Sequence, residues 1–169
     1  MKQAQSDSLA IRNALEENLW AMWSRFGKGE GCTLHNDPGA LWFETPIPKL
    51  PYNSVIRFAV EENVDPRIDQ IFETYRSRNV PFIWIVHPSA RPTDIEQRLR
   101  ARGFEEVELC QGMWMDLTRL ADEIALPDGF VVREVAQGGD VESLLDLVFW
   151  RWDVPGEYRR SAKKNSGGI

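Results

Sequence analysis

The sequence predicts an α/β (α+β) protein in which helices flank a mixed, mostly antiparallel central sheet. A hairpin pattern at residues 32–45 is followed by strand-like and helix-like segments that alternate between residues 54 and 117. Hydrophobic residues make up 43% of the 169 residues, and seven Trp and eight Phe are among them. Such a chain can bury a sizeable core, because each buried aromatic ring removes a large apolar area from water.

The first element is predicted to be a helix from Ser8 to Phe26. Apolar residues recur there at spacings of four, three and four, which places them on one helix face. These residues are Leu15, Leu19, Met22 and Phe26. Asp7 is suited to cap the start of the helix, and Gly27 to end it.

A β-hairpin is predicted next. Its strands are Cys32–Asn36 and Ala40–Thr45, and the residues Asp37-Pro38-Gly39 form the turn between them. The segment Pro46–Pro51 contains three prolines, so we expect it to be a loop rather than a central strand.

A β-α-β pattern occupies the middle of the chain. Ser54–Val60 is rich in β-formers and predicts a strand, and Pro66–Ser77 predicts a helix with Asp65 as its N-cap. Val80–His87 is almost wholly apolar, which predicts a buried strand at the centre of the sheet.

A third helix is predicted from Asp94 to Arg102. Thr93 and Glu96 fit a capping box at its start, and Gly103 is suited to stop it.

The remaining segments predict a complete first unit and an incomplete second one. Two closing strands, Glu106–Cys110 and Gly112–Leu117, are followed by a short helix or linker at Thr118–Leu126, a strand at Phe130–Val135, a helix at Asp140–Trp152 and a loose polar tail at Ser161–Gly168. We therefore expect a first domain at 1–117, a linker at 118–129 and an unfinished second unit at 130–169.

Composition excludes several classes of function. The net charge is −6 and no basic run is present, which disfavours nucleic-acid binding. No stretch approaches the roughly 18 apolar residues of a membrane span, and the N-terminal residues lack a signal-peptide pattern, so we expect a cytoplasmic protein that does not insert in membranes. Cys32 and Cys110 have no CxxC spacing or neighbouring His and are interpreted as small strand hydrophobes. His35, beside the turn, is expected to be exposed, and its distance in sequence from His87 predicts no metal site.

Several segments point to one family. They are the strand Phe82–Val86, the helix end Leu99–Phe104 with its Gly-Phe pair, the closing residues Met113–Leu117, and Ser54–Tyr75 upstream. In this order they resemble a GNAT-type acyltransferase domain, with Ser54–Tyr75 in the place of the family's fourth strand and central helix. Phe130–Val135 resembles the opening strand of a further such domain. The resemblance implies a tandem protein, with a divergent first copy over Cys32–Leu117.

The resemblance also implies a site for acetyl-CoA. The family holds the pyrophosphate on backbone N–H groups after the fourth strand and at the following helix N-terminus. Here the implied contacts are Val60, Asn63 and Arg67, with Ser89 after the next strand. The family's glycine-rich signature is missing from this link. The acidic residues Glu61, Glu62 and Asp65 would repel a pyrophosphate.

Candidates for the catalytic base follow from the chemistry of the implied reaction. An amine attacks the thioester directly, so the protein supplies positioning, a base and oxyanion stabilisation. Glu61 or Glu62 would occupy the place of a base at the end of the fourth strand, and His87 ends the apolar strand. The alternative interpretation is that these are two solvated loop acids and a locally hydrogen-bonded histidine.

Three functions remain open from the sequence. The first is an N-acetyltransferase that uses acetyl-CoA on a small amine, with a groove between the strands Ser54–Val60 and Val80–His87 for the pantetheine arm. The second is a non-catalytic GNAT-like module that binds a small ligand or supports a catalytic partner domain. The third is an interaction domain that forms a homodimer through its aromatic-rich first helix. The missing glycine loop favours the second and third functions, whereas the activity that is usual in the family favours the first.

Overall fold

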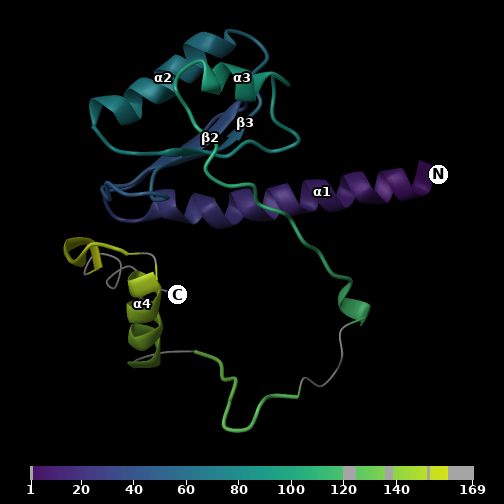
Figure 1. Ribbon diagram of the computed structural model, residues 1–169, viewed down its shortest axis with the longest axis vertical. Helices are drawn as coiled ribbons and strands as arrows, with labels where there is room; N and C mark the ends of the chain where they lie inside the picture. Colours follow the sequence, from purple (N-terminus) through teal and green to yellow (C-terminus); the bar gives the residue numbers. More distant parts are fainter. Residues whose placement is uncertain (1, 120–124, 136–138, 152, 160–169) are drawn as a thin grey trace. The chain divides into compact units, whose positions relative to one another are not determined.

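The computed structural model describes residues 2–119, 125–135, 139–151 and 153–159 (Figure 1). The chain divides into two compact units, Met1–Gly112 and Met113–Ile169. The first unit contains a four-stranded sheet in the order β1-β2-β3-β4. Its strands are β1 (Thr33–Asn36), β2 (Ala40–Glu44), β3 (Ser54–Phe58) and β4 (Ile83–Trp84). The pairs β1–β2 and β2–β3 are antiparallel and β3–β4 is parallel, which confirms a mixed, mostly antiparallel α+β fold.

The predicted hairpin is confirmed. Thr33 faces Glu44 and Asn36 faces Leu41 across the pair β1–β2. The turn closes with a hydrogen bond from the Asp37 N–H to the Ala40 carbonyl at 3.0 Å. His35 was predicted to be exposed, but it is half-buried, because its ring stacks on Trp42 at 3.6 Å between centroids.

A bulge bends the pair β2–β3. Leu41 faces Arg57 and Trp42 faces Val55, so Ile56 is the extra residue on β3. Ile56 packs in the same buried cluster as Leu41, and the Arg57 guanidinium carbon lies 5.6 Å from the centre of the Trp20 ring. The bulge thus turns a charged side chain of β3 toward the first helix.

Helices cover both faces of this sheet (Figure 1). α2 (Val64–Ser77) and α3 (Ile95–Arg100) lie on one face, and α1 (Lys2–Trp23) with the 3-10 helix Ser24–Lys28 lies on the other. The larger core cluster, on the α2–α3 side, comprises Ala40, Trp42, Val55, Phe58, Ile68, Ile71, Tyr75, Trp84, Ile95 and Leu99. The smaller one, on the α1 side, comprises Leu41, Phe43 and Ile56, with Trp20, Trp23, Leu34 and Ile85 packed against it.

The limits and the packed face of α1 differ from the prediction. The helix begins at Lys2 rather than Ser8, so Asp7 lies within it and is not its cap. Met22 is exposed, whereas Phe26, although partly exposed, stacks on Phe43 of β2 at 5.8 Å between ring centres. Trp20 and Trp23 also pack against the sheet.

The caps predicted for the next two helices are absent as well. Asn63, in a left-handed conformation with φ of 52°, precedes α2 and makes no side-chain cap hydrogen bond; Asp65 lies in the first turn. Asp94 precedes α3 and likewise makes no side-chain cap bond, so the expected box with Thr93 and Glu96 does not form. Both carboxylates instead accept hydrogen bonds from an arginine, since Arg98 donates to Asp94 and to Asp65.

The stop at Gly103 is confirmed. Its φ of +85° is readily adopted by a residue without a Cβ. Phe104, directly after it, packs against the larger core cluster.

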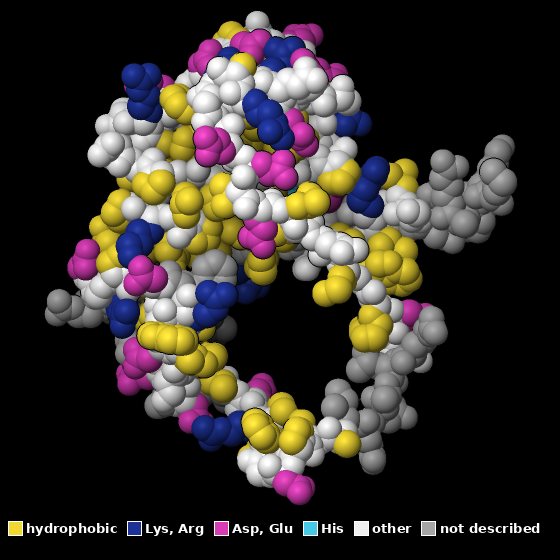
Figure 2. Space-filling model, viewed as in Figure 1, with side chains coloured by type: hydrophobic (Ala, Val, Ile, Leu, Met, Phe, Trp, Pro, Cys, Tyr) yellow, Lys and Arg dark blue, Asp and Glu magenta, His cyan; other side chains and the backbone are white. Residues whose placement is uncertain are grey.

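The segment Val80–His87 is not a central strand, contrary to prediction. Only Ile83–Trp84 pairs, and it forms the edge of the sheet that the structure describes. The two expected closing strands, Glu106–Cys110 and Gly112–Leu117, are absent; these residues are extended but make no ladder, and they are exposed. An alternating apolar pattern forms a strand only where another strand offers hydrogen bonds. Apolar side chains of residues 107–117, which follow α3, are therefore exposed to solvent (Figure 2).

The described part of the second unit contains helices and coil but no strand. It contains a 3-10 turn at Leu117–Arg119 and the predicted helix, α4 (Gly139–Arg151). Phe130–Val135 is exposed coil rather than the expected strand, and none of the described segments pairs with it. Part of the predicted linker, 120–124, and the predicted tail, 161–168, lie outside the described residues.

Two further properties concern the whole described chain. Within the described residues, no helix combines the length and the apolar character needed to cross a membrane. Cys32 and Cys110 are free thiols, and Cys110 is exposed rather than packed in a strand. Burial raises the pKa of the Cys32 thiol.

Candidate functional site

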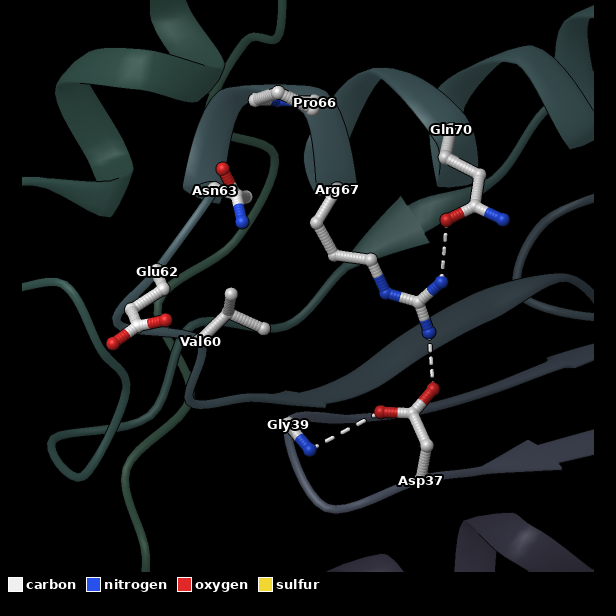
Figure 3. A pocket seen from close by; sticks show the side chains of 8 residues that line it. All are labelled: Asp37, Gly39, Val60, Glu62, Asn63, Pro66, Arg67 and Gln70. Atoms are coloured by element: carbon white, nitrogen blue, oxygen red, sulfur yellow. Dashed lines mark hydrogen bonds and ion pairs between the residues drawn. The ribbon is translucent and has the colours of Figure 1, made fainter.

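A pocket of about 380 Å³ lies where the β1–β2 turn meets the start of α2 (Figure 3). The turn, the link after β3 and the first turns of α2 all contribute to its wall. The lining residues are Asp37, Gly39, Val60, Glu62, Asn63, Pro66, Arg67 and Gln70. Four of the predicted site residues are therefore brought together here: Val60, Glu62, Asn63 and Arg67.

The chain direction at Asn63 shapes this wall. The left-handed conformation of Asn63 turns the link sharply into α2, which begins at Val64. The first intrahelical donor is the Arg67 N–H, which bonds to the Asn63 carbonyl at 3.1 Å. The N–H groups of Val64 and Asp65 thus have no partner within the helix, and Pro66 has no N–H. The pocket therefore borders a helix N-terminus whose N–H groups the N-cap side chain leaves unbonded.

Arg67 and Asp37 form the fixed part of the pocket. Arg67 extends from α2 toward the β1–β2 turn and forms an ion pair with Asp37 (Figure 3). Its other terminal nitrogen donates to Gln70 Oε1 at 2.6 Å. The Asp37 Oδ1 atom accepts bonds from the backbone N–H groups of Gly39 at 3.1 Å and Ala40 at 2.9 Å. Both ends of the ion pair are thus held by other hydrogen bonds.

The formal charges on the pocket wall sum to −1. Arg67 contributes +1, and Asp37 and Glu62 contribute −1 each. Asp65, next to the pocket in sequence, is bonded to Arg98 and to Arg102, the latter at 2.9 Å. The Arg67 charge is already paired with Asp37, so the unpaired charge of the wall is the exposed carboxylate of Glu62.

The other predicted residues lie elsewhere. Glu61 is exposed and does not line the pocket. Ser89 donates its hydroxyl hydrogen bond to the buried carboxylate of Glu16 on α1. His87 is hydrogen-bonded to the Ile56 carbonyl at 3.0 Å, so its Nε2 carries a proton. Burial lowers the pKa of His87, although the nearby Glu16 carboxylate opposes this shift.

After β4 the chain leaves β3 and pairs with the β3 segment again at Arg91. Ile85 N–H donates to the Val55 carbonyl at 2.9 Å, and Arg91 N–H donates to the Phe58 carbonyl at 3.1 Å. Between these bonds the residues 86–90 bow away from β3. The His87 imidazole bridges to β3 within this interval, so a side chain links the segments where the main-chain pairing is interrupted.

Sequence reasoning missed two important carboxylates. Asp37 was recognised only as a turn residue, because its contact with Arg67 joins residues that are 30 positions apart. Glu16 was missed as well, although an acidic residue on the inner side of an amphipathic helix is a signal that could have found it. Glu16 is buried, its Oε2 accepts from Ser89, and its Oε1 has no hydrogen-bond partner among the described residues.

The described residues contain no group of three or more His, Cys, Asp or Glu side chains placed to hold a metal ion. The predicted coenzyme contacts that lie together are Val60, Asn63 and Arg67, and Ser89 does not line the same pocket. Chemically, this pocket offers one unpaired carboxylate, two amide side chains and a helix N-terminus. Comparisons with family models, curated proteins and solved structures found no match for this chain.

Proposed function

We propose that residues 1–112 form a divergent GNAT-like module that binds a small amine in the pocket between the β1–β2 turn and α2, without catalysing acyl transfer. The order of elements supports the GNAT-like part of this proposal. β3 runs into α2, the parallel strand β4 follows, and α3 ends in Gly103-Phe104. The absent closing strands and the edge position of β4 are the departures from that order.

The single observation that carries the choice of an amine is the ion pair between Arg67 and Asp37. A cation that is already paired offers little net attraction to a second anion. Glu62 then leaves the wall with a charge of −1, which attracts an ammonium group and repels the pyrophosphate of a coenzyme.

The polar groups around Glu62 define the class of amine. The N–H groups at the start of α2 and the Asn63 amide can donate to a hydroxyl or carbonyl oxygen. The ligand class is thus a small amine that also carries such an oxygen. Glycinamide and ethanolamine are its simplest probes.

Acyl transfer with acetyl-CoA is the second candidate function. It is favoured by one observation: Glu62, a candidate base, shares a pocket with Arg67 and the N-terminus of α2. In this reading Val60, Asn63, Arg67 and Ser89 hold the coenzyme, and Glu61, Glu62 or His87 accepts the proton of the amine. The non-catalytic reading requires none of these steps.

One set of titrations separates the two functions. Calorimetry on the full chain compares glycinamide with acetyl-CoA and desulfo-CoA, in the native protein and in Arg67→Ala. Removing Arg67 frees the Asp37 carboxylate, so we expect glycinamide to bind more tightly to the variant. A coenzyme held by Arg67 would bind more weakly to it. Binding of desulfo-CoA but not glycinamide would overturn the amine proposal in favour of the second function.

A further inference from the structure

The outer edge of β4 has unused backbone hydrogen-bonding groups. The N–H groups of Ile83 and Ile85 point toward β3, where they donate to the carbonyls of Asn53 and Val55 at 3.0 and 2.9 Å. Backbone groups alternate in direction along a strand, so the N–H and C=O of Trp84 point away from the sheet. No strand lies beyond β4 in the part of the chain that the structure describes. An apolar edge of this kind readily pairs with another strand.

The same chain carries a strand-like segment without a partner. In Glu106–Cys110 the acidic residues Glu106 and Glu108 alternate with the apolar Val107 and Leu109, which is the pattern of a strand with one apolar face. In the structure these two apolar residues are exposed to solvent: Val107 is 78% exposed and Leu109 is 89% exposed. A single chain thus contains both an open strand edge and an unpaired amphipathic strand.

The path of the segment keeps it from pairing with its own β4. Phe104, at its start, packs on Phe82 and Trp84 at 5.2 and 6.1 Å between ring centres, on the α2–α3 side of the sheet. Gly112, at its end, lies beside Leu15 of α1, which covers the opposite side. The residues between them therefore pass from one face of the sheet to the other, instead of running along the edge.

We propose that two copies of this chain exchange the segment Glu106–Cys110, so that each segment forms a fifth strand on the outer edge of β4 of the other copy. Each copy offers the open outer edge of β4 and the unpaired segment Glu106–Cys110, so a two-fold exchange pairs each of these edges with one of these segments. Among the described residues, the one side-chain interaction of the segment is the exposed Arg100–Glu106 ion pair at 3.0 Å, and such pairs contribute little. The exchange does not depend on the pocket or on any ligand.

The exposed thiol of Cys110 gives a direct test. A nitroxide is attached to Cys110 in a Cys32→Ser chain without ¹⁵N, and this chain is mixed with a ¹⁵N-labelled Cys110→Ser chain. We expect a dimer by light scattering, and loss of the amide signals of residues 83–86 in the ¹⁵N-labelled copy. A monomer would overturn the proposal, and so would a dimer in which those signals persist. Protection of the Val107 and Leu109 amides in a monomer would also overturn it, by showing that the chain covers its own edge.

A proline substitution supplies the second test. Leu109→Pro removes a backbone donor from the segment, so we expect at least about tenfold weaker dimerisation. Val131→Pro is the matched control, because Val131 is also exposed, at 87%, in coil outside the segment. Neither substitution removes a buried contact, so both chains should fold. Equal dimerisation of the two variants would contradict the exchange.

Discussion

The guanidinium of Arg67 donates a hydrogen bond to the carboxylate of Asp37, and this ion pair joins the start of α2 to the turn between β1 and β2. In the function proposed above, this ion pair uses the Arg67 charge and so determines which ligands the adjoining pocket attracts. Asp37→Asn keeps an oxygen for the turn N–H groups but removes the negative charge. We expect a loss of unfolding free energy below about 1 kcal/mol, since both partners are partly exposed to water.

Asp37→Asn should also weaken glycinamide binding, because it raises the charge of the pocket wall from −1 to 0. Calorimetry gives the affinity, and urea unfolding gives the stability. Asp37→Ala is the comparison: it also loses the two turn hydrogen bonds, so it should be less stable than Asp37→Asn. Equal stability of the two variants would show that the turn bonds contribute nothing.

Burial of Tyr75 predicts a loss of stability at alkaline pH. Its hydroxyl donates to the Phe43 carbonyl at 2.8 Å, and burial, aided by the Glu44 carboxylate, raises its pKa above the ordinary value. The unfolded chain releases this proton above about pH 10, but the folded chain keeps it. Unfolding free energy should therefore fall above about pH 10 in the native chain, and less so in Tyr75→Phe. Tyr75→Phe should itself cost about 1 kcal/mol at neutral pH, because a buried hydrogen bond is lost. Urea unfolding at neutral and alkaline pH measures both effects.

His87 predicts a pH effect in the acidic direction. Burial lowers its pKa in the folded state, so the unfolded chain binds the proton first as the pH falls. Its contribution to stability is present above about pH 6.5 and is lost as the pH falls through the lowered value. His87→Gln retains a side-chain donor for the Ile56 carbonyl but does not titrate. The variant should lose less unfolding free energy between pH 7 and 5 than the native chain, and identical pH profiles would refute this assignment.

Gly27 predicts a steric effect on the α1 side of the core. A Cβ at this position would lie 2.7 Å from the Phe43 Cβ and 3.0 Å from the Leu34 Cβ. Gly27→Ala should therefore lower the unfolding free energy by about 1–3 kcal/mol through overpacking. Gly156→Ala is the control, since a Cβ there meets nothing within 4 Å. Thermal unfolding of both variants checks the prediction, which fails if Gly27→Ala is as stable as the native chain.

The elements of the first unit could largely be predicted from local patterns. The hairpin, the helix ending at Ser77 and the stop at Gly103 depend on turn residues and apolar periodicity within a few positions. The strands predicted at Glu106–Cys110 and Gly112–Leu117 are absent, and local patterns could not show this, because a strand forms only where a second strand pairs with it. The apolar run Val80–His87 indicated a buried central strand. Such a run lies at the edge of the sheet when the strand expected on its other side does not form.

The pocket was predicted only in part, for a similar reason. Glu62, Asn63 and Arg67 are close in sequence and could be recognised as one link between a strand and a helix. The partner of Arg67 could not, since Asp37 reaches it only after the hairpin has folded against α2. The charge of the wall, and hence the class of ligand, depends on that non-local contact.

The most direct test of the amine pocket is a titration of the ¹⁵N-labelled full chain with glycinamide, followed by the amide signals of Asn63, Val64 and Asp65. We predict that these signals shift, that Glu62→Gln weakens the affinity by about tenfold, and that Glu61→Gln, one residue away but outside the pocket wall, leaves it unchanged. Signals that stay fixed with glycinamide, or equal effects of the two substitutions, would contradict the account.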